Sequence, residues 1–246
     1  LAFHALGQAD DIVYDALVGE GILALAGTGA VLHHAGKRGG KPSAKQADIT
    51  EKLIELARSG RKVLRLKGGD PFIFGRGGEE ALALAAAGVP FRLVPGITAA
   101  VAGLAYAGIP ITDRRVNSAV TFITGHESGG GPPEGLDWPA LATGAPVLIL
   151  YMALKHLAWM AERLIDAGLS PDTAVVLISK ATTQDQHILE THLAAAAADA
   201  EAAGIEAPAI VAIGDVVDLR AALDPGATPE ARARAVLQLG DSRKNE

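Results

Sequence analysis

The sequence predicts an α/β fold of two α/β/α domains with mixed, mostly parallel sheets. Short apolar runs alternate with longer helical patterns along most of the 246 residues, as expected when strands are joined by helices. Glycine-rich turns follow several of these runs. With 49% hydrophobic and 20% charged residues, the chain can bury a sizeable core in one or two domains.

In the first half, runs of apolar and β-branched residues predict strands at 11–14, 30–33, 63–66 and 91–94. Helical patterns follow at 43–59, 78–87 and 98–107. Ser43 is a suitable N-cap for the first of these helices, and Gly88 ends the second. This order predicts an N-terminal α/β domain over residues 1–113.

In the second half, strands are predicted at 119–124, 146–151, 175–179 and 209–213, with helices at 155–167, 189–203 and 216–223. Residues 110–118 are predicted to cross between the halves, so the C-terminal α/β domain covers 114–223. Residues 224–246 are polar and without a clear period, which predicts a disordered or loosely helical tail.

Composition excludes several classes of site. The chain has no cysteine, so it forms no disulfide or thiolate metal site, and its seven histidines lack metal-ligand spacing. We therefore expect no metal. No apolar run approaches the ~18 residues that span a bilayer, and no signal peptide opens the sequence, so we expect a cytoplasmic protein. The phosphate-binding and dinucleotide-binding glycine motifs are absent, which disfavours ATP and NAD.

The charge is unevenly distributed along the chain. The net charge is −6, yet the segment from Lys37 to Arg76 holds 11 Lys and Arg against four Asp and Glu. Nucleic-acid-binding domains are usually basic as a whole. A basic stretch in an acidic protein instead indicates an anionic small molecule. The alternative, which we favour for five of these cations, is solvated charges on helix faces: Lys45, Lys52, Arg58, Arg61 and Lys62.

The stretch from Arg65 to Glu79 is the most informative part of the sequence. A strand runs into a Gly-Gly-Asp turn, and a glycine-dense loop with Arg76 and Glu79 follows. Glycine lets backbone approach a ligand closely, and ligands of α/β sheets bind at the carboxyl ends of strands. The alternative is a tight turn in which Asp70 is satisfied locally. Five glycines around three charged residues favour a binding loop.

Other motifs leave two interpretations open. Asp15, just past a strand, could handle a proton or cap a turn, and Lys37 and Arg38 lie in a glycine-flanked loop suited to carboxylates or phosphates. Thr98 could face a ligand or cap a helix. Met152 could form an apolar wall or belong to the core. The segment 113–115 could face a cleft or form an interdomain salt bridge.

Together these motifs resemble the tetrapyrrole methylase family over about residues 5–223. The resemblance rests on VYDALV at 13–18, GKRGG at 36–40, LKGGDPFIFGRGGEE at 66–80, VPGITAA at 94–100, AGIPIT with Arg114 and Arg115 at 107–115, residues 121–126 and Tyr151-Met152. It implies two α/β/α domains with a cleft between them, usually in a homodimer, and S-adenosyl-L-methionine as methyl donor, with S-adenosyl-L-homocysteine as product.

The resemblance also implies roles for individual residues. The residues implied to hold the cofactor are Gly68, Gly69, Asp70, Ile73, Thr98, Ala99, Met152 and the backbone near Ala181. Those implied to act on the substrate are Asp15 and Lys37 in proton handling and Arg76, Glu79 and Arg114 on the substrate side. The implied substrate is uroporphyrinogen III, methylated at C2 and C7 to give precorrin-2 via precorrin-1 for cobalamin or sirohaem synthesis.

Three alternatives stay open at this point. A sister enzyme could methylate a later precorrin, although the 66–80 block disfavours it; the chain could bind cofactor or tetrapyrrole without turnover; or it could be a structural protein. The family begins with a strand and a G-x-G-P-G-D loop, whereas this sequence starts at Leu1 within the helix that would follow. We therefore expect that first strand and loop to be missing from the sequence.

Overall fold

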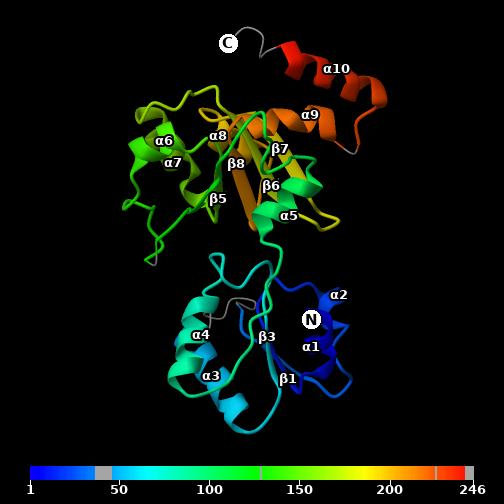
Figure 1. Cartoon of the computed structure of the whole chain (residues 1–246). Helices are drawn as coiled ribbons and strands as arrows, with labels where there is room; N and C mark the ends of the chain where they lie inside the picture. Colours follow the sequence, from blue (N-terminus) through cyan, green and yellow to red (C-terminus); the bar gives the residue numbers. More distant parts are fainter. Residues whose placement is uncertain (37–45, 128, 225, 242–246) are drawn as a thin grey trace. The chain divides into compact units, whose positions relative to one another are not determined.

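The computed structural model describes residues 1–36, 46–127, 129–224 and 226–241 (Figure 1). Its contacts divide the chain into a first unit, Leu1–Thr98, and a second unit, Ala99–Glu246. Each unit has its own sheet, so the two are described in turn.

The first unit has a parallel sheet between two pairs of helices. Its elements are α1 (Ala2–Gln8), β1 (Asp11–Tyr14), α2 (Glu20–Leu23), β2 (Val31–His34), α3 (Gln46–Arg58), β3 (Val63–Leu66) and α4 (Gly77–Ala86). The strand order is β2-β1-β3, with Tyr14 opposite both His34 and Leu66. Helices α3 and α4 lie on one side of the sheet and α1 and α2 on the other (Figure 1). All three strands therefore end at the same edge.

The core of the first unit lies between α3 and the sheet. Ile49, Leu53 and Leu56 of α3 are buried and pack with Val13 and Ala35. Their spacing puts the three side chains on one face of a helix, as the sequence pattern predicts. This packing fixes the helical layer against the sheet and leaves the strand ends free for loops.

The second unit has a mixed sheet. Its elements are α5 (Ala99–Tyr106), β4 (Thr121–Thr124), α6 (Trp138–Gly144), β5 (Leu148–Tyr151), η1 (Leu154–His156), α7 (Leu157–Asp166), β6 (Ala174–Ser179), β7 (His187–His192), α8 (Ala196–Ala202), β8 (Ala209–Ile213), η2 (Asp215–Leu219), α9 (Arg220–Leu223) and α10 (Pro229–Asp241). The strand order is β4-β5-β8-β6-β7, and β4 and β5 run parallel. The other pairings are antiparallel. The predicted α/β class is confirmed, but this sheet is less parallel than predicted.

Both faces of the second sheet are covered. Leu177 of β6 belongs to the core cluster formed with α7 and α8. Its neighbour Ile178 points to the opposite face, where a Cβ built on Gly103 of α5 would lie 3.9 Å from it. Because neighbouring residues of a strand face opposite sides, burial on both faces requires a continuous apolar run. The central strands β5, β6 and β8 have such runs.

Two secondary-structure predictions were wrong. Residues 91–94 form no strand: Phe91 and Leu93 are 50% and 40% exposed, and the segment pairs with no described strand. The predicted helix at 189–203 is strand β7 followed by the short helix α8, because all six residues of β7 pair with β6. In both places, the presence or absence of a neighbouring strand overrode the local pattern.

The unit boundary differs from the predicted one, and the tail follows the helical one of its two predicted alternatives. The division falls after Thr98 rather than at 113, since α5 packs on β6, where a Cβ on Gly103 would lie 3.2 Å from that of Ala181. The tail contains α10, in which Thr228 Oγ1 accepts a hydrogen bond from Ala231 N at 3.2 Å. Thr228 followed by Pro229 is a helix-start signal that the aperiodic composition obscured.

Candidate functional site

The loops after the three parallel strands of the first unit pack closely together. Asp15 follows β1, Gly36 lies just beyond β2, and Gly68 follows β3. A Cβ on Gly36 would lie 2.7 Å from Ala16 N, and one on Gly68 would lie 3.0 Å from Leu17 Cβ. Only glycine permits such approaches. The predicted Lys37 comes directly after Gly36 and lies outside the described residues.

The Asp70 side chain ties two loops together. Its Oδ1 accepts a hydrogen bond from Phe72 N at 2.8 Å, and its Oδ2 accepts one from Gly96 N at 3.0 Å. A Cβ on Gly96 would lie 2.1 Å from Gly69 O, so the two backbones are in direct contact. Each oxygen of the Asp70 carboxylate therefore holds one backbone amide, which fixes the two loops against each other.

The glycines of this loop offer backbone donors. Gly68 and Gly69 are exposed, and their amides donate to no residue in the described part of the chain. Gly69 has φ of 74°, a conformation that an L side chain adopts only with strain. Ile73, half-buried in the same loop, donates from its amide to Asp70 O at 3.4 Å. The loop is thus fixed internally, and the amides of its two exposed glycines have no acceptor among the described residues.

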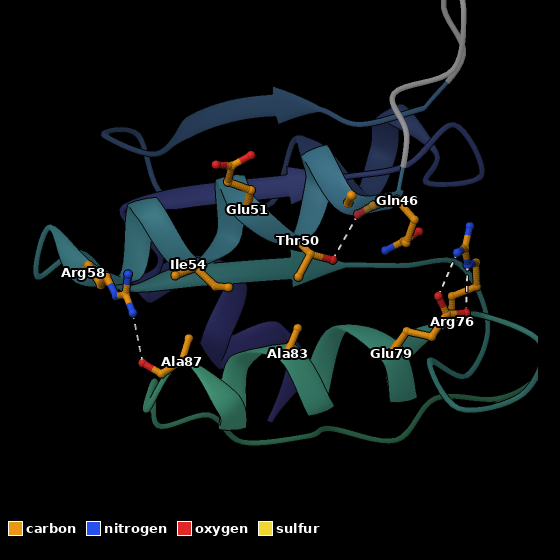
Figure 2. A pocket seen from close by; sticks show the side chains of 10 residues that line it. Gln46, Thr50, Glu51, Ile54, Arg58, Arg76, Glu79, Ala83 and Ala87 are labelled. Carbon is orange, nitrogen blue, oxygen red and sulfur yellow. Dashed lines mark hydrogen bonds and ion pairs between the residues drawn. The ribbon is translucent and has the colours of Figure 1, made fainter.

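Arg76 and Glu79 form an exposed ion pair at the start of α4. Arg76 Nε is 3.0 Å from Glu79 Oε1, and Nη2 is 2.7 Å from Oε2. These hydrogen bonds are the main cause that lowers the pKa of Glu79, so its carboxylate is ionised at neutral pH. The pair lies at one end of an open groove of about 710 Å³ between α3 and α4 (Figure 2). The groove runs along the helices, away from the strand ends.

Sequence reasoning missed two residues beside Asp15. Lys67 Nζ is 3.8 Å from Asp15 Oδ2 and 3.9 Å from Glu80 Oε1. Glu80 in turn accepts hydrogen bonds from Arg65 and Gln46. Burial is the main cause that lowers the pKa of Lys67. Arg65 and Lys67 are two residues apart at the end of a strand, so their side chains lie on one face of the sheet. This spacing could have predicted that both cations contact the same acidic group.

The second unit brings other predicted residues to one edge of its sheet. Tyr151 of β5 and Ile178 of β6 both pair with Ile210 of β8, so these two strands end at the same edge, on either side of β8. Met152 follows β5 and is 46% exposed, and Ala181 lies in the turn after β6. The start of α5 joins them, since Ala100 N donates to Tyr151 Oη at 3.2 Å. Ala99, Met152 and Ala181 therefore lie at the same edge.

Two further predicted residues lie apart from these groups. Arg114 is exposed on a turn of the second unit, whose shape Asn117 fixes by donating to Ile111 O and Ala119 O, both at 3.1 Å. Thr98 is 8% exposed and is the last residue of the first unit. The predicted substrate-side residues are thus divided, with Arg76 and Glu79 in the first unit and Arg114 in the second.

Comparison with known proteins identifies the family. The family described as Tetrapyrrole (Corrin/Porphyrin) Methylases matches residues 1–197. The chain belongs to the tetrapyrrole methylase family. A uroporphyrinogen-III C-methyltransferase of Sinorhizobium sp is 61% identical over 223 residues, covering 91% of this chain and 80% of the relative.

Two other tetrapyrrole methylases extend the comparison. An S-adenosyl-L-methionine-dependent uroporphyrinogen III methyltransferase of Methanosarcina barkeri is 45% identical over 218 residues, covering 89% of this chain and 86% of the relative. A crystal structure of uroporphyrin-III C-methyl transferase from Thermus thermophilus, complexed with S-adenyl homocysteine, has a TM-score of 0.72 and 33% identity. It covers 87% of this chain and 90% of that one.

In this tetrapyrrole methylase, strained backbone is concentrated in the loops described above. Among the described residues, the non-glycine residues with positive φ are Phe74, Arg76, Met152, Lys180 and Thr182. Such conformations cost of order 1–3 kcal/mol each and gather at ligand-binding sites. All five lie after β3, β5 or β6, where the predicted cofactor residues also lie.

The described residues contain neither a metal-binding cluster nor a membrane-spanning helix. No cluster of three or more His, Cys, Asp or Glu is arranged to hold a metal ion within 1–36, 46–127, 129–224 and 226–241. Across the same residues, every helix is too short or too polar to cross a bilayer.

Proposed function

We propose that this chain transfers methyl groups from S-adenosyl-L-methionine to C2 and C7 of uroporphyrinogen III, giving precorrin-2 via precorrin-1. The observation that carries the proposal is the loop at 68–70, which is fixed by Asp70 and presents two exposed amides at the carboxyl edge of a parallel sheet. Ligands of α/β sheets bind at this edge. The relatives from Sinorhizobium and Methanosarcina support the substrate, and the Thermus thermophilus complex supports the cofactor.

The residues of both edges fit such a cofactor. S-adenosylmethionine has a zwitterionic amino-acid end, a sulfonium and a nucleoside, so it needs backbone donors and a soft apolar surface. The amides of Gly68 and Gly69 provide donors, and the exposed Met152 side chain provides such a surface. The proposed cofactor set is Gly68, Gly69, Asp70, Ile73 and Thr98 from the first unit, with Ala99, Met152 and Ala181 from the second.

The chemistry asks mainly for positioning. When bound, the cofactor supplies an electrophilic methyl group to an electron-rich pyrrole carbon. The chain holds the ring carbon in line with that methyl, and such orientation removes several kcal/mol from the barrier. The rigid loop at 68–70 and the strained turns after β5 and β6 supply fixed surfaces for this purpose.

Charged residues provide anchors for the carboxylates of the substrate. Arg76 and Arg114 are exposed arginines, and a guanidinium binds carboxylates through two parallel hydrogen bonds. The further cations Lys37 and Arg38 lie outside the described residues. Other cations of the basic stretch pair within the protein, as Arg61 does with Asp11 and Arg65 with Glu80, so the proposed anchors are a part of this stretch.

A base must remove a proton from the alkylated ring carbon, and Asp15 and Glu79 are the sequence candidates. Both oxygens of Glu79 are engaged by Arg76. Asp15 uses Oδ1 to accept a hydrogen bond from Leu17 N at 3.0 Å, while its Oδ2 faces Lys67 at 3.8 Å. Asp15 Oδ2 accepts no hydrogen bond from the described residues, so we assign the proton transfer to Asp15. Glu79 is assigned the role of fixing the Arg76 guanidinium.

Calorimetry with S-adenosyl-L-homocysteine, followed by a turnover assay with uroporphyrinogen III, tests the proposal. Micromolar binding and a product carrying two added methyl groups are expected. Binding without turnover would mean that the chain is either a cofactor-binding module or an enzyme for a later precorrin. An assay with that later precorrin would distinguish the two. Absence of binding would contradict the proposed cofactor.

We also propose a homodimer. The family resemblance supports it, as do large apolar side chains on the first unit that are 40–52% exposed, namely Phe72, Phe74 and Phe91. Light scattering should report twice the chain mass of 25.1 kDa. A single-chain mass at micromolar concentration would contradict it.

A further inference from the structure

Lys67 has an unusual position at the carboxyl edge of the first sheet. It directly follows β3, its side chain is 12% exposed, and its ammonium lies between two carboxylates. Nζ is 3.8 Å from Asp15 Oδ2 and 3.9 Å from Glu80 Oε1. Both separations exceed hydrogen-bond length, so the ammonium acts on these carboxylates through its charge.

Glu80 is the fixed member of this group. Its side chain is 5% exposed, and both oxygens lie 3.2 Å from Arg65 Nε. Gln46 Nε2 donates to Oε1 at 2.8 Å. Glu80 is thus bound to β3 and to α3, and its position depends little on Lys67.

Asp15 is the less constrained member. Its side chain is 23% exposed, and apart from the Leu17 amide on Oδ1, Lys67 is the partner that the described residues give it. A cation therefore lies between a fixed, buried carboxylate and a partly exposed one. Because Glu80 attracts the Lys67 ammonium and the ammonium attracts Asp15, the fixed position of Glu80 restricts where the Asp15 carboxylate lies.

We propose that Lys67 is a positioning residue, whose ammonium holds the Asp15 carboxylate directed to the open edge of the sheet. The inference rests on the proposed function, because it gives Lys67 its role through proton removal by Asp15. Lys67 itself does not contact the substrate in this scheme. It differs from the proposed carboxylate anchors Arg76 and Arg114, which are exposed.

Four charged groups among the described residues face Lys67. Asp15 after β1 and Glu80 of α4 favour the ammonium, whereas Arg65 of β3 and Arg76 at the start of α4 disfavour it. Burial is the largest influence, and together these hold the pKa of Lys67 below its usual range. The pair with Asp15 is therefore lost at a lower pH than a solvent-exposed lysine pair would be.

Two substitutions test the role in turnover. Lys67→Met keeps the apolar stem and removes the charge, so kcat should fall about 10–100-fold, less than the loss of a general base itself. Binding of S-adenosyl-L-homocysteine should change by less than about twofold, because no cofactor contact is removed. Lys67→Arg keeps a charge that does not titrate, so it should recover most of kcat and carry activity to higher pH.

Lys52→Met is the matched control. Lys52 is exposed and pairs with Glu55 at 3.0 Å on α3, so the same change removes an ion pair distant from the strand ends. The control should leave both kcat and the pH profile as in the wild type. If Lys67 had a purely structural role, Lys67→Met would lower thermal stability. Lys67→Arg would then leave the alkaline side of the pH–activity profile where it is in the wild type.

A second measurement does not depend on activity. Titration of the lysine 13Cε resonances of the full chain should show Lys67 losing its proton below the other lysines. Asp15→Asn should lower this midpoint further, because it removes one of the two carboxylates that favour the ammonium. An unchanged Lys67 midpoint in Asp15→Asn would overturn the inference, whatever the turnover.

The two experiments separate the possible failures. If the wild type does not methylate uroporphyrinogen III, the proposed function fails, and the NMR titration still decides whether Lys67 acts on Asp15. If the wild type is active and Lys67→Met has the same kcat and pH profile, the proposed function stands and the role of Lys67 is refuted. Should Lys67→Met fail to fold, Lys67→Arg and the titration decide.

Discussion

Asp70 Oδ2 accepts a hydrogen bond from Gly96 N at 3.0 Å and so joins two loops that are 26 residues apart in the chain. The same approach brings Gly69 O against Gly96. The joined loops carry Gly68, Gly69 and Ile73 on one side and lead to Thr98 on the other. A single carboxylate thus organises most of the proposed cofactor residues of the first unit.

Gly96→Ala should separate these loops. The new Cβ would lie 2.1 Å from Gly69 O, and backbone cannot move aside as a side chain can. We expect a loss of about 1–3 kcal/mol in unfolding free energy and at least about tenfold weaker binding of S-adenosyl-L-homocysteine by calorimetry. Gly78→Ala is the control, because a Cβ on Gly78 in α4 meets nothing within 4 Å. It should raise stability by up to about 1 kcal/mol; unimpaired binding in Gly96→Ala would contradict the close approach.

Met152→Ala should weaken cofactor binding while leaving the fold intact. The side chain is 46% exposed, so its truncation should change unfolding free energy by less than about 0.5 kcal/mol. A thioether buried by the cofactor contributes about 1.5 kcal/mol, or roughly a tenfold change in Kd. Val236→Ala, also at an exposed apolar position, should leave Kd unchanged. Equal Kd values for Met152→Ala and the wild type would remove Met152 from the site.

Arg76→Ala should abolish methyl transfer and spare cofactor binding. Its ion pair with Glu79 is exposed and contributes less than about 1 kcal/mol to stability. Loss of a bidentate contact with a substrate carboxylate should lower kcat/KM by at least about 100-fold. Lys52→Ala, which breaks another exposed i,i+3 pair, is the control. Turnover at the wild-type rate would exclude Arg76 from the mechanism.

Asp11→Asn should destabilise the first unit in a pH-dependent way. Asp11 is buried and accepts hydrogen bonds from Arg61 and from His33 Nε2, and the Arg61 bond is the main cause that lowers the pKa of Asp11. A lowered carboxyl pKa adds stability that is fully present above about pH 4 and is lost as pH falls through the folded-state value.

Because 41% of the Arg61 side chain is exposed, we expect the low end of a charged hydrogen bond, about 1.5 kcal/mol at pH 7. Denaturant unfolding of both proteins at pH 7 and near pH 3 measures it. The difference between wild type and variant should shrink at the lower pH. A difference that stays constant across this range would show that the effect is steric.

Local sequence was sufficient for several elements. The strands β1, β3 and β8 begin and end where their apolar runs and turn residues indicated. The helical face predicted at Ile49, Leu53, Ile54 and Leu56 is buried except at Ile54, which is half-buried. These features depend on residues close together in the chain, so local periodicity carries the information.

Strand pairing was not readable in the same way. The 91–94 run has a strand-like composition and pairs with no described strand. Residues 189–192 were predicted as the start of a helix, but they belong to β7, which pairs with β6. Likewise, nothing local places β8 antiparallel between β5 and β6. Backbone hydrogen-bonding groups are the same in every residue, so the choice of partner is made by packing of the whole sheet.

The sequence by itself determined the family and the residue types of the site, because glycine spacing and charges in the 66–80 block are local properties. Only the tertiary structure decided what each side chain does. It engaged both oxygens of Asp70 with backbone amides and placed Gln46 on Glu80, 34 residues away. It also set Lys67 between Glu80 and Asp15. These contacts join strand ends, loops and helices distant in the chain, and their energy depends on distance and burial, which exist only once the chain is folded.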